Sequence, residues 1–139
     1  MFRRKPDEVI RKNYLQRWHL IPHNKYLNIY LHKFTGSDED RAFHDHPWHS
    51  VSFLLKGNLT EFYHGYWTQA GNFVCCRRRI KKYMPYFRKA REDHRLELPE
   101  GCDEVITLFI KGPKIRDWGF ITEQGWVYWE TFLETFTEK

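Results

Sequence analysis

The stretch of sequence that decides the fold runs from residue 44 to residue 63 and reads HDHPWHSVSFLLKGNLTEFY. Its central part, Ser50 to Lys56, is rich in residues that favour strands, which predicts a β-strand. Gly57 and Asn58 follow as two turn residues, and the segment from Leu59 to Tyr63 resumes a strand pattern. We therefore predict a β-hairpin directly after two closely spaced histidines.

Short strands separated by turn residues continue on both sides of this stretch. Further candidate strands cover 26–34, 66–68, 72–77, 94–98, 104–110, 118–121 and 126–129. Helix is expected only at the ends, with an N-terminal arm or helix over 1–20 and a short C-terminal helix over 130–139. No linker or internal repeat divides the chain, so we expect one domain over 1–139. The predicted fold class is all-β, closed into a sandwich or barrel.

The composition of the 139 residues fits a folded domain. Hydrophobic residues make up 41% and charged residues 29%, which is unlike a disordered chain, and the aromatic share of 18% favours strands with a packed face. No apolar run reaches the about 18 residues of a membrane span. The N-terminal residues show no apolar secretion signal, and the three cysteines show no C-x-x-C spacing. We expect a cytoplasmic protein with no membrane partner.

Three histidines are candidates for a metal site. His44 and His46 are two residues apart, so on an extended segment both imidazoles project to one side, and Asp45 between them projects to the other. A metal site built on strands needs nitrogen ligands side by side, about 2.0–2.1 Å from one ion. The third ligand must come from elsewhere, and His94 is the best candidate because it opens an alternating strand. We predict that these histidines bind a divalent transition metal.

Other residues near these histidines are candidates for catalysis or substrate binding. Glu61, on the strand after the turn, is a candidate catalytic acid or fourth metal ligand, and Tyr63 is a candidate proton carrier. His49 is a second candidate for a fourth ligand. The predicted substrate-binding residues directly follow the histidine pair: Trp48, His49 and Ser50.

The histidine segments resemble the sequence motifs of the cupin superfamily. His44, His46 and Gly57 fall at the spacing of the first cupin motif, G-x5-H-x-H-x3,4-E-x6-G, and His94 corresponds to the histidine of the second motif. More narrowly, the sequences H-D-H-P-W, H-R-L-E-L and W-G-F are similar to those of small single-domain cupins from phages and bacteria. This resemblance covers about residues 14–132 and implies a cupin-type jelly roll.

The chain departs from the first motif at two positions. Ser50 stands where the motif has its glutamate, and Asp38 stands where it has its first glycine. Loss of the glutamate leaves three histidines, which resembles the sites of thiol dioxygenases and some diketone-cleaving cupins. The resemblance thus implies a mononuclear dioxygenase that acts on a small molecule, with Fe(II) as the favoured ion and Mn, Ni or Zn as alternatives. A homodimer is one assembly that the resemblance leads us to expect.

Three alternative functions remain open at this stage. An isomerase would use the same ion as a Lewis acid, and a non-catalytic module would bind the metal or a small ligand without turnover. A nucleic-acid-associated protein would use the basic segment 77–91, in which aromatic residues follow Arg77, Arg78 and Arg79. This last alternative weighs least, because a net charge of +5 is only moderately basic for this length.

Overall fold

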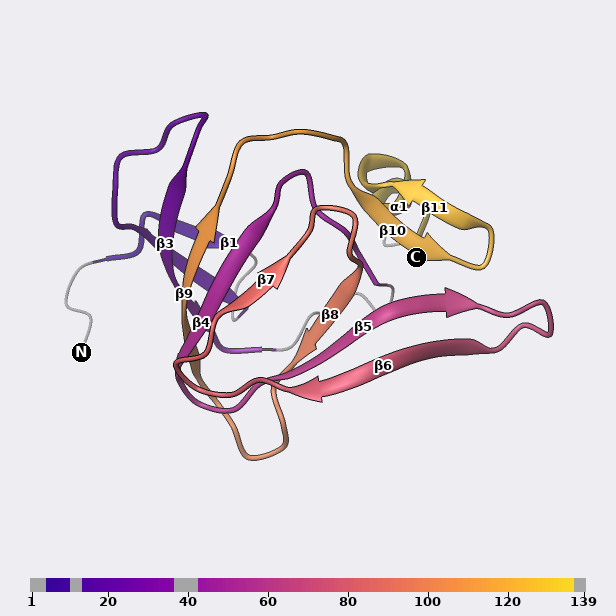
Figure 1. The fold of residues 1–139 in the computed structure, drawn as a ribbon, viewed down its shortest axis with the longest axis horizontal. Coiled ribbons are helices and arrows are strands. Elements are labelled where there is room, and N and C mark those ends of the chain that lie inside the picture. The colour runs from indigo at the N-terminus through magenta and orange to yellow at the C-terminus, as the bar shows by residue number, and fades with distance from the viewer. Residues whose placement is uncertain (1–4, 11–13, 37–42, 137–139) are drawn as a thin grey trace.

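Two antiparallel sheets make up most of the computed structural model, which describes residues 5–10, 14–36 and 43–136 (Figure 1). The elements are β1 (Glu8–Ile10), β2 (Leu15–His19), β3 (Asn28–Phe34), β4 (Ser50–Lys56), β5 (Thr60–Trp67), β6 (Phe73–Arg79), β7 (Tyr86–Arg88), β8 (His94–Glu97), β9 (Val105–Lys111), β10 (Gly119–Thr122), β11 (Gly125–Tyr128) and α1 (Trp129–Phe136). The larger sheet has the order β1-β2-β3-β9-β4-β7 and the smaller one β6-β5-β8, while β10 and β11 form a separate pair. The expected all-β jelly-roll class is confirmed.

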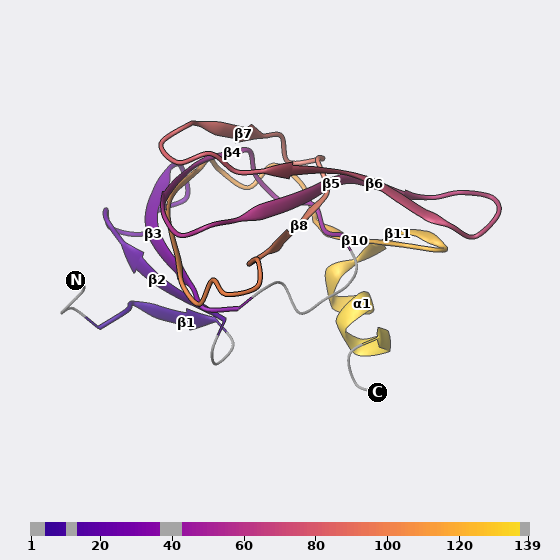
Figure 2. The same ribbon diagram turned by 90° about the horizontal axis from the view of Figure 1, so that it is seen from below.

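The two sheets wrap around one interior (Figure 2). Strand β3 pairs with β9 along its whole length, from Asn28 opposite Lys111 to Phe34 opposite Val105. Because side chains alternate along a strand, every second residue of these strands faces the interior. One end of the interior is filled by an apolar cluster of Leu15, Phe34, Leu54, Leu59, Ile80 and Val105. Polar and metal-ligating side chains are therefore left to the other part of the interior.

The N-terminal arm or helix expected over residues 1–20 is wrong for the described residues, which form strands β1 and β2. Strand β2 pairs with β3, and its Leu15 and Trp18 are buried. The acidic residues that resembled a first helical turn make bonds to β2 instead: Asp7 accepts from the backbone N–H of His19, and Glu8 accepts from Arg17. Pairing with the sheet thus overrides a weak helical signal. Residues 1–4 and 11–13 lie outside the described part.

The hairpin predicted from the opening stretch is also wrong, although both of its strands exist. Strand β4 pairs with β7 and β9, whereas β5 pairs with β6 and β8 in the other sheet. Gly57 therefore stands at a corner between two sheets. Its φ is 91°, and a Cβ atom there would lie 2.4 Å from the backbone oxygen of Glu104. Only glycine fits this corner without strain.

The C-terminal part follows the prediction closely. Strands β10 and β11 form a hairpin, and α1 begins at Trp129, one residue before the helix expected over 130–139, with residues 137–139 outside the described part. The ring of Phe132 stacks on Phe120 at a centroid distance of 4.0 Å, which holds α1 against β10. No helix in the described part of the chain is long and apolar enough to cross a membrane.

Candidate metal centre

The segment that carries His44 and His46 is fixed by its backbone. The N–H of His44 donates to the carbonyl of His94 at 3.1 Å, and the N–H of His94 donates back to the carbonyl of His44 at 2.9 Å. The N–H of His46 donates to the carbonyl of Ala90, and the N–H of Asp45 to that of Gly119. These bonds place the histidine segment between β8 and β10. Two ligands from one segment and a third from β8 are thereby brought together.

Asp45 anchors the same segment from its opposite side, as its parity predicted. The side chain is 3% exposed, and one carboxylate oxygen accepts from the backbone N–H of Gly119 at 2.7 Å. The other oxygen accepts from the indole N–H of Trp126 at 2.9 Å and pairs with Arg116 at 2.7 Å. Glycine is required at residue 119 by the close pairing of β10 with β11, because a Cβ atom there would lie 2.1 Å from the carbonyl oxygen of Val127.

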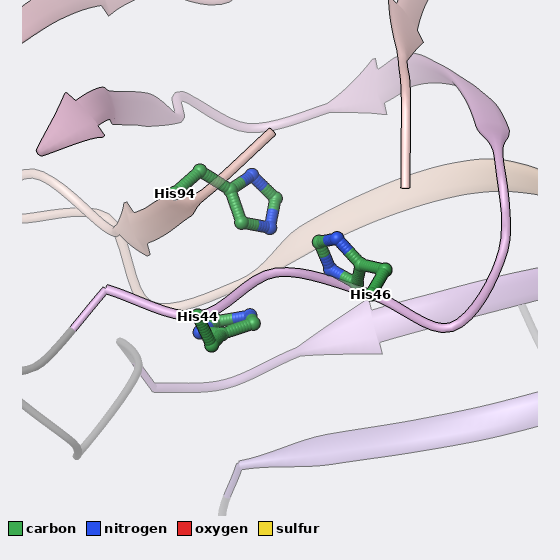
Figure 3. Close-up of side chains that lie close together, drawn as sticks. All are labelled: His44, His46 and His94. Carbon is green, nitrogen blue, oxygen red and sulfur yellow. The ribbon is translucent and has the colours of Figure 1, made fainter. Parts of the chain in front are cut away.

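The three predicted histidines point toward one another (Figure 3). One ring nitrogen from each of His44, His46 and His94 lies within 4.8 Å of the others. The ring centroids are 4.7–5.2 Å apart. Among the described residues, these three form the cluster that could hold a metal ion. Three imidazoles at this separation are a donor set that suits a divalent transition metal.

The state of His46 fits a metal ligand. Burial, together with the neighbouring rings of His94 and His44, holds the pKa of His46 well below its usual range. Its ring is therefore neutral, and a neutral ring has a lone pair for an ion. The Nδ1 atom of His46 is buried without a hydrogen-bond partner in the described structure. Such an orphaned atom is costly unless a ligand or water meets it, so the residues present fit a bound ion.

Glu61 holds His94 in place and does not face the ligand cluster as an additional member. Its carboxylate is 1% exposed and accepts from the Nδ1 of His94 at 2.6 Å, from Arg88 at 2.5 Å and from Arg78 at 2.7 Å. Burial alone would raise the pKa of this carboxyl, but the bond from His94 and the charge of Arg88 hold it well below its usual range. Because the Nδ1 of His94 is engaged by Glu61, its Nε2 is the ring nitrogen that remains for an ion.

A cavity of about 190 Å³ lies beside the three histidines. Trp48 lines it and stacks on His46 at a centroid distance of 5.0 Å. Three other predicted residues are absent from the described lining: Tyr63, His49 and Ser50. Tyr63 packs under the guanidinium of Arg78, and the Nδ1 of His49 accepts from the backbone N–H of Ala90. His49 and Ser50 follow the bend at Pro47, and Tyr63 lies on β5.

Several lining residues were missed by the sequence reasoning. They come from distant parts of the chain: Arg17, His32, Ser52, Arg88 and Thr107. Arg17 lies directly opposite His32 in the pairing of β2 with β3, and His32 lies opposite Thr107 in the pairing of β3 with β9. One signal was available in the sequence. Tyr30, His32 and Phe34 are each two residues apart, so on a strand their side chains project to the same face.

Some arginine side chains of the basic segment 77–91, proposed for nucleic-acid binding, point into the protein, and others are exposed. Arg78 turns toward Glu61, whereas Arg77 and Arg79 are exposed and Arg79 donates to Asn58. Arg88, near the end of this segment, is 6% exposed and bound to Glu61. Two of the segment's arginines therefore support the site. Arg95 pairs with Glu97 on the outward side of β8, as its parity predicted.

No family model matches the sequence, and no curated protein matches it. Solved structures do share its fold. The DMSP lyase DddQ from Ruegeria pomeroyi DSS-3 has a TM-score of 0.53 and 15% identity over 74% of this chain and 49% of that chain. Hydroxypropylphosphonic acid epoxidase from S. wedmorenis has a TM-score of 0.56 and 15% identity over 80% of this chain and 59% of that one.

A smaller protein is also similar. A cupin superfamily protein from Desulfitobacterium hafniense DCB-2 has a TM-score of 0.53 and 12% identity over 77% of this chain and 84% of that chain. The present chain thus spans about half of the lyase and about three fifths of the epoxidase, but most of the smaller cupin. The fold is that of the cupins, which confirms the expectation drawn from the histidine motifs. Identities this low establish the fold alone.

Proposed function

We propose that this protein is a mononuclear metal-dependent enzyme of dioxygenase type that acts on a small molecule. The observation that carries the proposal is the convergence of His44, His46 and His94 beside a cavity. Three neutral ligands leave the full charge of a divalent ion in the site and leave positions for substrate and dioxygen. Fe(II) is the proposed ion. A structure of Fe(II)-HppE, a hydroxypropylphosphonic acid epoxidase, is among those that share the fold, with a TM-score of 0.56.

The protein's own residues would prepare this chemistry in separate ways. The carboxylate of Glu61 would orient His94, and the backbone pair between His44 and His94 would keep the ligands together. Trp48, stacked on His46, would limit the access of water to the site. A bound Fe(II) would supply the activation of dioxygen. Glu61 is proposed as a positioning residue, because its oxygens are already engaged by His94 and two arginines.

Metal content tests the proposal directly. We expect about one transition-metal ion per chain, measured by plasma mass spectrometry, in the wild type and in the exposed-histidine control His23→Ala, and loss of that ion in His44→Ala. Oxygen uptake by the Fe(II)-loaded protein would then be screened with small organic acids. A wild-type protein that takes up none of Fe(II), Mn(II), Ni(II) and Zn(II) on titration would contradict the metal site. Metal binding with no oxygen uptake for any compound would favour the non-catalytic alternative.

A further inference from the structure

The polar lining of the cavity is unusual in its charge. The charged groups of its lining are the guanidiniums of Arg17 and Arg88, and no carboxylate lies among the described lining residues. The carboxylates that pair with these arginines, Glu8 and Glu61, are not part of the described lining. An ion held by the histidines would add two further positive charges. The interior would therefore be strongly electropositive.

The guanidinium of Arg17 is held by two hydrogen bonds that leave some of its N–H donors available. Its Nε donates to the Nε2 of His32 at 2.9 Å, and its Nη1 donates to Glu8 at 3.3 Å. The group lies over the ring of Tyr30, with its central carbon 4.4 Å from the centroid. A guanidinium has five N–H donors, and these two bonds use two of them. Arg17 is thus a fixed cation on the cavity wall with capacity for an acceptor.

His32 completes a set of donors. The Nε of an arginine can only donate, so the Nε2 of His32 must accept, and a neutral ring then carries its proton on Nδ1. Burial, with a smaller contribution from Arg17, holds the pKa of His32 well below its usual range, which keeps the ring neutral. Because Nε2 is engaged and Nδ1 is protonated, His32 is not suited to bind the metal. It presents an N–H donor instead.

Arg88 and Ser52 extend the same chemistry toward the other edge of the larger sheet, where β4 and β7 lie. The Nη1 of Arg88 donates to the hydroxyl oxygen of Ser52 at 2.6 Å, so the hydroxyl hydrogen of Ser52 remains available for another acceptor. The single carboxylate of Glu61 faces two guanidiniums, those of Arg88 and Arg78. This cluster keeps a net positive charge even after its internal pairing.

The size and the apolar part of the cavity restrict the ligand further. A volume of about 190 Å³ corresponds to about six water molecules at roughly 30 Å³ each. The remaining walls include apolar side chains at one end: Leu15, Phe34, Leu59 and Leu96. We propose that the cavity binds a small organic anion whose carboxylate is held by Arg17 and whose short apolar part lies against these leucine and phenylalanine side chains. This inference rests on the proposed function, because it names the substrate class of that same site.

A pair of probes of equal size tests the role of charge. Butyrate and its neutral counterpart butyramide would be titrated by calorimetry into zinc-loaded protein, because zinc permits binding without redox turnover. We expect saturable binding of one butyrate per chain and at least about tenfold weaker binding of butyramide. Arg17→Met should weaken butyrate binding by about tenfold or more without loss of zinc. Arg79→Met removes the same charge from an exposed position and should leave the affinity unchanged.

Metal-free protein separates this inference from the proposed function. Butyrate binding that persists without zinc and disappears in Arg17→Met supports the anion site even if no metal binds. Equal affinity for butyramide, or unchanged butyrate affinity in Arg17→Met, overturns the inference while zinc content still reports on the metal site. If Arg17→Met does not fold, Arg17→Lys takes its place, since lysine keeps the charge but loses the planar fork. A severalfold loss of affinity in Arg17→Lys then supports the proposal, and an unchanged affinity overturns it.

Discussion

At the scale of single residues, Glu61 links the folding of the protein to the geometry of the metal site. Its carboxylate joins His94 on β8 to Arg88 on β7 and Arg78 on β6, so three strands meet at one buried charge. Partners that hydrogen-bond to a metal-binding histidine fix its ring orientation and raise its basicity. We therefore propose that Glu61, which sequence reasoning assigned to catalysis, would act on a bound metal only through His94.

Glu61→Gln should weaken metal binding although no ligand is lost. Glutamine keeps the shape of the side chain but removes the charge that supports His94, and we expect metal affinity to fall by about 10- to 100-fold. Competition with a chromophoric chelator would measure this change. Glu97→Gln is a matched control, because Glu97 pairs with Arg95 near the surface of the same strand. Equal metal affinities in wild type and Glu61→Gln would contradict the positioning role.

His32 should make stability depend on pH. Its pKa in the folded chain lies well below the ordinary value of 6.5, so between these two pKa values the unfolded chain binds more protons. The contribution of His32 to the free energy of unfolding should therefore decrease as the pH falls below about 6.5, by up to about 1.4 kcal/mol per pH unit, and that of His46 should decrease in the same direction. Urea unfolding of metal-free protein at pH 7.5 and 5.5 would measure the decrease. In His32→Gln the decrease should be smaller, and an identical decrease in both proteins would contradict the assignment to His32.

At the scale of elements, the histidine segment depends on β10 for its position. Asp45 is the connection, with its carboxylate bound to Gly119, Trp126 and Arg116. The β10–β11 hairpin is in turn held by α1 through Phe120 and Phe132. The C-terminal elements thus form a support behind the ligands, although they contribute no ligand themselves.

Asp45→Ala should lower both stability and metal affinity. The substitution removes the acceptor of two N–H groups and leaves Arg116 only its longer bonds to backbone carbonyls, and we expect a loss of about 3–5 kcal/mol in the free energy of unfolding. Chemical denaturation and chelator competition would measure the two effects. Asp117→Ala, at an exposed pair with Lys114, should change neither by more than about 0.5 kcal/mol. Unchanged metal affinity in a folded Asp45→Ala protein would show that the ligand segment keeps its position without this anchor.

The strand pattern of the sequence predicted local structure better than it predicted pairing. Alternation placed His44 and His46 on one side and Asp45 on the other, because side-chain direction depends only on neighbouring residues. The pairing of β4 was missed, since Gly57 and Asn58 resemble a hairpin turn whether the chain turns back or crosses to the other sheet. A positive φ at Gly57 is compatible with both outcomes. Only the contacts with distant Val105 and Glu104 decide between them.

The candidate site shows the same division. The three ligands could be proposed from spacing and from their resemblance to known motifs. The Arg17–His32 pair could not, because it forms only when β2 joins the edge of β3 and thereby brings a distant cation onto the interior face. The sequence of residues 1–20 contained an acidic start that favoured a helix, and a helix would have left Arg17 elsewhere. Because the sequence did not predict strand β2, it also did not predict that Arg17 lines the cavity.

At the scale of the whole molecule, metal binding should stabilise the fold by mass action. The ligands lie together only in the folded chain, so an ion at 100 times its dissociation constant should add about 2.7 kcal/mol to the free energy of unfolding. Thermal unfolding with and without Zn²⁺ would show the increase, and a chelator should reverse it. His44→Ala should show a much smaller shift than wild type. A wild-type melting temperature independent of zinc would contradict the site.

The two reciprocal backbone hydrogen bonds between His44 and His94 also bear on which metal ion would occupy the three-histidine site in a living cell. This pair brings the two ligand-bearing segments together through backbone bonds that do not depend on the identity of the ion. Imidazole sites generally prefer later first-row ions, so supply and not the site's preference would select a metal such as iron. Protein prepared from zinc-rich growth medium would then contain zinc whatever its native ion. The identity of the resident metal should therefore be compared across media that differ in iron and zinc.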